Sequence, residues 1–294
     1  MKKLMLLSSM LLFMTSCSDD DNIDTQNTAA ISGYKITTIS NYDDPAYNDY
    51  KRIITGNLSN GKLFSITTEF FTNNALISSE TVQRYFYTNN LLTHIVLGGN
   101  YGDDYFYDSQ NRFVGATRLY DDASTMYYRF VHQNATTVYC ERTNLPYNDP
   151  TAVASSRMIL NFDQEDNVTS AGFDNNFDGT PDNLYTYTYL NGNLTSMQKP
   201  DGTVINYNYE NVIDSYYVLA ENSYGKKVLR IICSESYCGG SIDYLDNNLN
   251  ETPQDVSEFT YQTLPNNFYN KKTKIETLTS PTGVHTTETE FFFN

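Results

Sequence analysis

Tryptophan is absent from the 294-residue chain, and histidine occurs three times, as His94, His132 and His285. None of them belongs to an H-E-x-x-H motif, and the chain has no G-x-S-x-G motif or phosphate-binding loop. These absences remove the common signatures of metalloproteases, serine hydrolases and nucleotide-binding enzymes. The sequence therefore predicts a protein that is not an enzyme.

Two catalytic alternatives stay open at this level. Cys140 with a histidine could form a thiol dyad, although a cysteine on a tyrosine-rich strand is usually a small packed side chain. Paired carboxylates could hydrolyse glycosides, but acids in Asn/Gly turns are commonly solvated turn residues. Tyrosine rows could also bind sugars, and the lack of tryptophan weakens that case.

Positive charge is scarce, because 19 Lys and Arg stand against 35 Asp and Glu for a formal net charge of −16. Such a surface repels phosphate backbones, so we expect no nucleic-acid partner. Cysteine is also sparse. Cys233 and Cys238 are close enough in sequence to form a disulfide around a small loop, which would leave Cys140 unpaired.

Tyrosine, in contrast, is abundant, with 26 residues. In residues 184–210, Tyr185, Tyr187 and Tyr189 alternate with threonine, which is typical of a strand with one packed face. Asn191-Gly192 predicts a turn into a return strand, and Pro200-Asp201-Gly202 predicts the next turn. The stretch therefore predicts consecutive antiparallel hairpins.

Weaker copies of this hairpin recur along the chain, each with an aromatic-x-aromatic strand, an Asn-rich turn and a return strand. The spacing of 20 residues from Tyr87 to Tyr107 to Tyr127, and from Tyr187 to Tyr207, equals the length of one hairpin. The units resemble the YD repeats of RHS and teneurin-type proteins, best at residues 187–209. That resemblance implies a repeated β structure and no activity.

A long meander must bury one face and protect its edge strands, and curling the sheet until its ends approach does both. We therefore predict an all-β fold: an antiparallel meander of about 20-residue hairpin repeats, curled into a barrel-like sheet with little or no helix. Residues 213–222 could form a short helix but fit a strand equally well. The polar Thr/Asn/Asp faces lack the outward apolar band of a membrane barrel.

The N-terminus has the features of a targeting signal. Lys2-Lys3 precede an apolar run too short to span a bilayer, and Met14-Thr15-Ser16-Cys17 resembles a bacterial lipobox. The resemblance implies that residues 1–16 are a lipoprotein signal peptide and that Cys17 carries the lipid. Residues 17–30 then form a disordered acidic tether, and residues 31–294 form a single β-repeat domain.

The acidic run Ser18-Asp19-Asp20-Asp21 resembles the surface-export signal of Bacteroidetes lipoproteins. Together with the repeats, it makes the chain similar to a group of uncharacterised Bacteroidetes lipoproteins with a porin-like, barrel-like fold. That likeness implies a lipid anchor in the bacterial outer membrane, with the protein facing the exterior. A glycan or a protein at the cell surface is the expected partner.

An acidic loop precedes the best hairpin and has the spacing of a calcium loop. Oxygen-bearing side chains occupy its alternate positions: Asp174, Asn176, Asp178, Thr180 and Asp182. Gly179 permits the sharp turn that wraps the ion, and Thr180 would contribute through a backbone carbonyl. Tyr185 replaces the bidentate Glu of an EF-hand, so binding should be weak, at about 10⁻⁴–10⁻³ M. The alternative is an Asx-rich turn without metal.

These observations predict a surface-anchored lipoprotein with a binding, adhesion or structural role, a calcium-stabilised loop and no catalysis. A carbohydrate-binding or glycan-degrading surface protein is the alternative.

Overall fold

The computed structural model describes residues 31–43, 46, 48–98, 101–120, 122–207, 215–232, 257–264, 268–279 and 282–293. The predicted signal peptide, Cys17 and the acidic tether lie outside these ranges, as do Cys233 and Cys238. The described strands are β1 (Ile31–Tyr42), β2 (Tyr50–Ser59), β3 (Lys62–Thr72), β4 (Ala75–Thr88), β5 (Leu91–Leu97), β6 (Tyr101–Tyr107), β7 (Phe113–Leu119), β8 (Thr125–His132), β9 (Thr137–Thr143), β10 (Ala154–Phe162), β11 (Val168–Phe173), β12 (Asn183–Leu190), β13 (Asn193–Gln198), β14 (Val204–Asn206), β15 (Ser257–Thr263), β16 (Tyr269–Thr279) and β17 (Thr282–Phe293).

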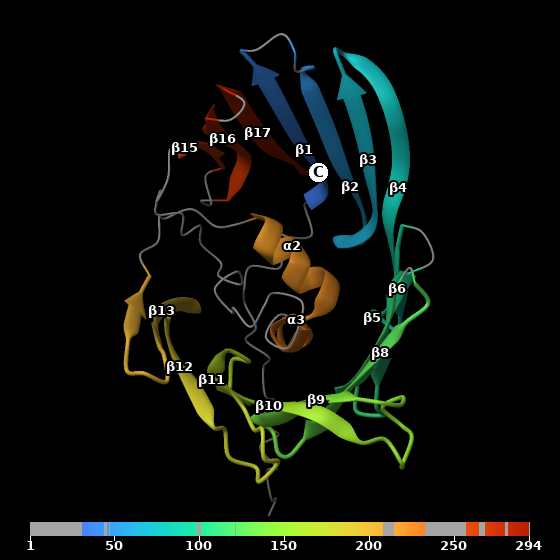
Figure 1. Cartoon of the computed structure of the whole chain (residues 1–294), viewed down its shortest axis with the longest axis vertical. Helices are drawn as coiled ribbons and strands as arrows, with labels where there is room; N and C mark the ends of the chain where they lie inside the picture. The colour runs from blue at the N-terminus through green and yellow to red at the C-terminus, as the bar shows by residue number, and fades with distance from the viewer. Residues whose placement is uncertain are drawn as a thin grey trace, which may run out of the picture.

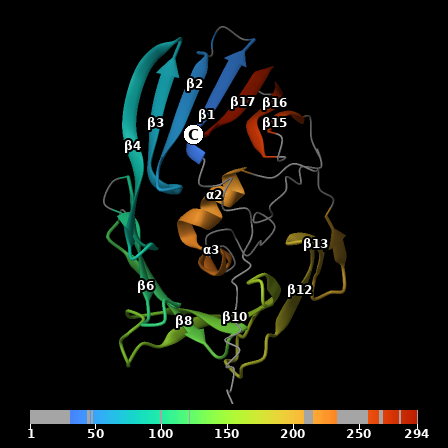
Figure 2. The same cartoon turned by 180° about the vertical axis from the view of Figure 1, so that it is seen from behind.

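Each strand pairs antiparallel with the next, from β1 to β14 and again from β15 to β17. The first and last strands, β1 and β17, also pair along their whole length. Among the described residues no ladder joins β14 to β15, which leaves a seam on one side of the curl (Figures 1 and 2). The predicted antiparallel meander with a barrel-like curl is confirmed.

A meander places successive connections at alternate ends of its strands. We call the end with the β1–β2, β3–β4, β5–β6, β7–β8, β9–β10, β11–β12 and β13–β14 connections the loop rim. The opposite end, with mostly shorter connections such as β2–β3 and β4–β5, is the turn rim. Strand β1 begins at the turn rim with Ile31, and the antiparallel β17 ends there.

The short connections follow the predicted turn chemistry. Positive φ angles occur at both turn residues of Asn60-Gly61, Asn73-Asn74, Asn89-Asn90 and Asn191-Gly192. A two-residue hairpin turn with left-handed backbone matches the twist of its flanking strands, and Asn and Gly tolerate that conformation best. These residues therefore set the register of four hairpins.

Two helices, α2 (Ser215–Tyr224) and α3 (Lys226–Ile232), lie within the curl of the sheet (Figures 1 and 2). The open choice for residues 213–222 is thus decided for helix from Ser215 onward, while residues 213 and 214 lie outside the described ranges, and α3 had not been predicted. Gly225 ends α2 with a φ of +84°, a left-handed conformation that most side chains disfavour, and its N–H donates to the Glu221 carbonyl at 2.7 Å. No helix in the described ranges is long and apolar enough to cross a membrane.

The helices are fixed to the turn-rim half of the sheet. The N–H of Leu63 donates to the Ser223 hydroxyl at 3.0 Å, and the Ser215 hydroxyl donates to the Tyr269 carbonyl at 2.8 Å. On α3, the Lys227 ammonium reaches the Ala135 carbonyl at 3.1 Å and the Asp166 carboxylate at 2.9 Å. These bonds join four separate parts of the curl to one helical pair.

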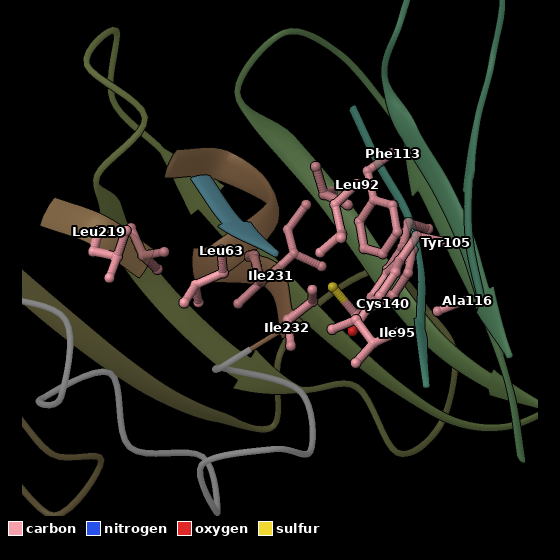
Figure 3. Close-up of a cluster of buried hydrophobic side chains, with 14 of the residues drawn as sticks. Leu63, Leu92, Ile95, Tyr105, Phe113, Ala116, Cys140, Leu219, Ile231 and Ile232 are labelled. Atoms are coloured by element: carbon pink, nitrogen blue, oxygen red, sulfur yellow. The ribbon is translucent and has the colours of Figure 1, made fainter. Parts of the chain in front are cut away.

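The aromatic face of the sheet points inward and forms the core with the helices. Figure 3 shows Leu219, Ile231 and Ile232 of the helices facing the sheet residues Leu63, Leu92, Ile95 and Cys140. Each fully buried Leu, Ile or Phe side chain contributes about 1.5–3 kcal/mol relative to exposure. The core is therefore made by the sheet and its enclosed helices together.

The predicted tyrosine period holds only in part. Tyr87 and Tyr107 pack against the core, but Tyr127 lies on the outer face because its neighbour Tyr128 is the buried residue. The spacing of 20 residues therefore reflects hairpin length and does not by itself fix which face a tyrosine occupies.

Candidate functional site

The inner face becomes polar toward the loop rim. Side chains of β1 alternate between the two faces of the sheet, so Ser40 faces inward like the buried Tyr34. The Ser40 hydroxyl lies 2.8 Å from Nδ1 of His285, which is its partner across the β1–β17 ladder. On β2 the same alternation places Arg52 inside, with its guanidinium 5.6 Å from the Phe70 ring centroid. The two ends of the curl thus differ in chemistry, apolar at the turn rim and polar at the loop rim.

An open cavity of about 540 Å³ lies at the loop rim beside β6, β7 and β8. It is lined by Tyr101, Tyr120, Asp122, Ser124 and Met126. Met126 is opposite Arg118 in the β7–β8 ladder, and Arg118 is opposite Asp103 in the β6–β7 ladder. Asp103 lies two residues before the buried Tyr105 on β6, so all three side chains are on the inner face. The cavity therefore opens on the inner face.

A buried ion pair supports the wall of this cavity. The Arg118 guanidinium donates two hydrogen bonds to Asp103, at 2.7 and 2.8 Å, and the Tyr105 hydroxyl donates a third at 3.2 Å. Asp103 is only 3% exposed, so this bidentate pair fixes the strand positions from which Tyr101 and Met126 project. Neither partner stands out in the sequence, since the two residues are 15 positions apart and lie on different strands.

The carboxylate of Asp122 is the charged group that lines the cavity. Hydrogen bonds from the Ser124 side chain and backbone lower the pKa of Asp122, and the Ser124 N–H lies 2.9 Å from its Oδ1. Asp122 is therefore an acceptor throughout the neutral range. Two phenol rings, a thioether, a hydroxyl and one fixed carboxylate can hold a small ring that carries hydroxyl groups.

The predicted calcium loop is closed by its own hydrogen bonds. Asp174 is fully buried, and its oxygens accept the N–H groups of Asp178 and Gly179, each at 3.0 Å. The Asp178 carboxylate accepts the Thr180 N–H at 2.7 Å and the Asn176 amide at 3.1 Å. Asp182 accepts the Asn175 N–H at 2.7 Å.

A positive charge already faces this loop. The Arg157 guanidinium lies 3.1 Å from the Asp174 carboxylate and 4.9 Å from the Phe177 ring centroid. In the described part of the chain, no three His, Cys, Asp or Glu side chains converge as metal ligands. Calcium would have to add to an arrangement in which Arg157 already partly neutralises Asp174. Calcium binding here stays a prediction.

Arg157 belongs to a larger ion network that the sequence did not reveal. Glu141 is 2% exposed and is shared by Arg129, at 2.7 Å, and Arg157, at 2.8 Å. Burial alone lowers the pKa of Arg157, but the hydrogen bonds that its guanidinium donates to Glu141 and Asp174 outweigh the effect of burial and raise that pKa. The network links β8, β9 and β10 to the loop after β11, so the loop is anchored to the sheet through arginine.

The catalytic alternatives gain no geometric support. Nδ1 of His94 lies 2.6 Å from the exposed Asp104, and Nε2 of His132 lies 2.8 Å from the Phe113 carbonyl. Cys140 is completely buried, between the sheet and α3 (Figure 3). Among the described lining residues of the cavity, Asp122 is the single carboxylate, whereas glycoside hydrolysis needs two.

Comparison with known proteins adds one structural likeness. No family model matches the chain, and no curated protein matches it. Among solved structures, the chain is similar to a porin-like protein from Bacteroides uniformis, with a TM-score of 0.39 and 12% sequence identity. The match covers 91% of this chain and 98% of the other.

Proposed function

We propose that this protein is a non-catalytic, lipid-anchored surface protein whose loop rim binds a small hydroxylated ligand, of which a sugar is the natural class. The observation that carries the proposal is the cavity lined by Tyr101, Tyr120, Asp122, Ser124 and Met126. Most tyrosines of the inner face pack in the core, but Tyr101 and Tyr120 are half-buried at the edge of the core.

The chemistry of the lining favours a sugar over a purely apolar ligand. Ring faces of Tyr101 and Tyr120 can cover the C–H faces of a pyranose, while the ionised Asp122 and the Ser124 hydroxyl accept or exchange hydrogen bonds with its hydroxyl groups. An isolated carboxylate can orient a sugar in this way. A single carboxylate cannot act as both the general acid and the general base of glycoside hydrolysis, so we infer that the site binds a sugar without cleaving it.

The fold also favours an outward orientation of the cavity. Ile31 begins β1 at the turn rim, and the tether of residues 17–30 would join it to a lipid on Cys17. Fourteen residues reach at most about 50 Å when extended, so the turn rim would stay near the membrane. The loop rim, with the cavity and the acidic loop of residues 174–182, would then face the medium.

A binding experiment tests this proposal directly. Purified protein lacking residues 1–17 would be screened on a glycan array and then titrated with its best sugar by calorimetry. We expect Tyr120→Ala to weaken binding about tenfold or more, because it removes one stacking face worth about 1–2 kcal/mol. Asp122→Asn tests the carboxylate, and Tyr127→Ala, on the outer face, is the matched control that should bind normally.

The anchor needs a separate measurement. Cys17→Ala should release the protein from the membrane fraction of the native cell, and protease added to intact cells should digest the wild type. Failure of every glycan to bind, or equal affinity of wild type and Tyr120→Ala, would remove the ligand part. Retention of Cys17→Ala in the membrane would remove the anchor part.

A further inference from the structure

We propose a second ligand site, independent of the loop-rim cavity, at Arg230 on α3, where the enclosed guanidinium binds a carboxylate group. Arg230 is 1% exposed and is among the largest fully buried side chains of the protein. A guanidinium cannot lose its proton in a protein, so its charge persists inside the curl. Nothing in the calcium loop or the cavity involves this residue.

The contacts of Arg230 leave its charge uncompensated. One bond is present: Nη2 donates to the Tyr217 hydroxyl, at 3.1 Å. Nε and Nη1 are buried without a hydrogen-bond partner, and in the described part of the chain no carboxylate pairs with Arg230. Arg118 and Arg157 are less buried, with side chains 18% exposed, and each of them has an acid: Arg118 has Asp103, and Arg157 has Glu141 and Asp174. A neutral phenol cannot replace such a partner.

The geometry selects the shape of the missing ligand. The Arg230 guanidinium carbon lies 5.6 Å from the Tyr217 ring centroid, so the ring covers part of the side chain. Three N–H donors on Nε and Nη1 remain, and they lie in the guanidinium plane. Nη2 also has a second N–H group besides the one that it donates to Tyr217. A planar carboxylate can accept that N–H together with an N–H of Nε or Nη1 in a bidentate arrangement, which a spherical ion cannot.

The surroundings exclude bulk water and strengthen the attraction. Tyr217, Val218 and Leu229 form an apolar cluster with Phe268 beside Arg230. Charges attract more strongly in such a medium, and an anion that compensates a buried cation gains most there. The inner face also carries exposed cationic side chains, Arg52 and Arg142, although the whole chain has a net charge of −16. Anions would therefore be drawn inward, past a negative exterior.

Thermal unfolding tests this site with acetate as the probe. The wild type should gain about 3 °C or more in melting temperature when acetate replaces chloride at constant ionic strength, since a ligand that binds only the folded state stabilises it. Arg230→Met, of similar length without charge, should lose the shift. Arg84→Met, an exposed arginine on the outer face of β4, should keep it. Phosphate, run in parallel, should give a smaller shift than acetate.

A second measurement covers the case in which Arg230→Met does not fold. Calorimetric titration of the wild type with acetate should show saturable binding with one site per chain, and Tyr217→Phe should weaken but retain it. An equal response of wild type and Arg230→Met, or no saturable binding by the wild type, would overturn the proposal. A phosphate shift larger than the acetate shift would overturn the carboxylate assignment.

Discussion

The N–H of Leu63 on β3 donates a hydrogen bond to the hydroxyl of Ser223 on α2, at 3.0 Å and across 160 residues of sequence. Ser223 donates its own proton to the Leu219 carbonyl one turn earlier, at 2.8 Å, which leaves an oxygen lone pair for Leu63. One serine thus joins the enclosed helix to the wall around it, and the bond is buried.

Ser223→Ala should destabilise the fold by about 1–3 kcal/mol, because the Leu63 N–H would lose its acceptor in a site that water does not reach. Urea unfolding followed by circular dichroism measures the loss. Ser59→Ala, exposed at the end of β2, is the control and should change stability by less than about 0.5 kcal/mol. Equal effects of the two variants would show that the Leu63–Ser223 bond does not hold the helix to the sheet.

Glu141→Gln should be more costly, at about 3–5 kcal/mol, because it leaves Arg129 and Arg157 without their shared charge in a buried site. The same unfolding assay measures it. Glu290→Gln removes a solvent-accessible partner of Lys271 at 3.7 Å and should have little effect. If Glu141→Gln also has little effect, the network is not a clamp on the loop of residues 174–182.

The pH dependence of stability should report on Tyr87. Burial raises the pKa of this phenol from 10.0 to about 12, against a smaller lowering by a hydrogen bond with Ser223. Below pH 10 the phenol is neutral in both states, and its contribution is complete. Between pH 10 and about 12 the unfolded chain ionises first, so that contribution is lost as pH rises.

Melting curves at several alkaline pH values check this expectation. Tyr87→Phe cannot ionise, so its stability should fall less steeply than that of the wild type over the same interval. Tyr127→Phe, on the outer face, should follow the wild type. Parallel curves for wild type and Tyr87→Phe would show that another group controls alkaline unfolding.

Calcium should stabilise the protein only weakly if it binds the loop of residues 174–182. At tenfold excess over a Kd of about 10⁻³ M, linkage gives about 1.4 kcal/mol, or roughly 3 °C in melting temperature. Asp178→Asn and Asp182→Asn should abolish the shift, whereas Asp201→Asn, in the turn before β14, should keep it. No shift at millimolar calcium would mean that the calcium prediction is wrong and that Arg157 holds Asp174 without metal.

Local features of the fold were accessible from the sequence because they depend on neighbouring residues. Alternation of Tyr185, Tyr187 and Tyr189 predicted β12, and Asn191-Gly192 predicted the turn that ends it. The loop of residues 174–182, predicted to bind calcium, is a compact turn around Asp174, and the hydrogen bonds within it span at most seven residues. Its calcium binding stays a prediction. Steric preference and side-chain length decide such features within a few residues.

The tertiary structure alone decided which face of the sheet became the core and where charge was buried. The alternation of side chains along a strand divides them between two faces, but it does not say which face is buried. The aromatic face is the interior because α2 and α3 pack against it. The sequence likewise could not show that Asp103 pairs with Arg118, or that Arg230 meets no acid among the described residues, because such contacts depend on which strands and helices the curl brings together. Local sequence was enough to specify the hairpins and their turns, whereas the sites formed only when the sheet curled around two helices.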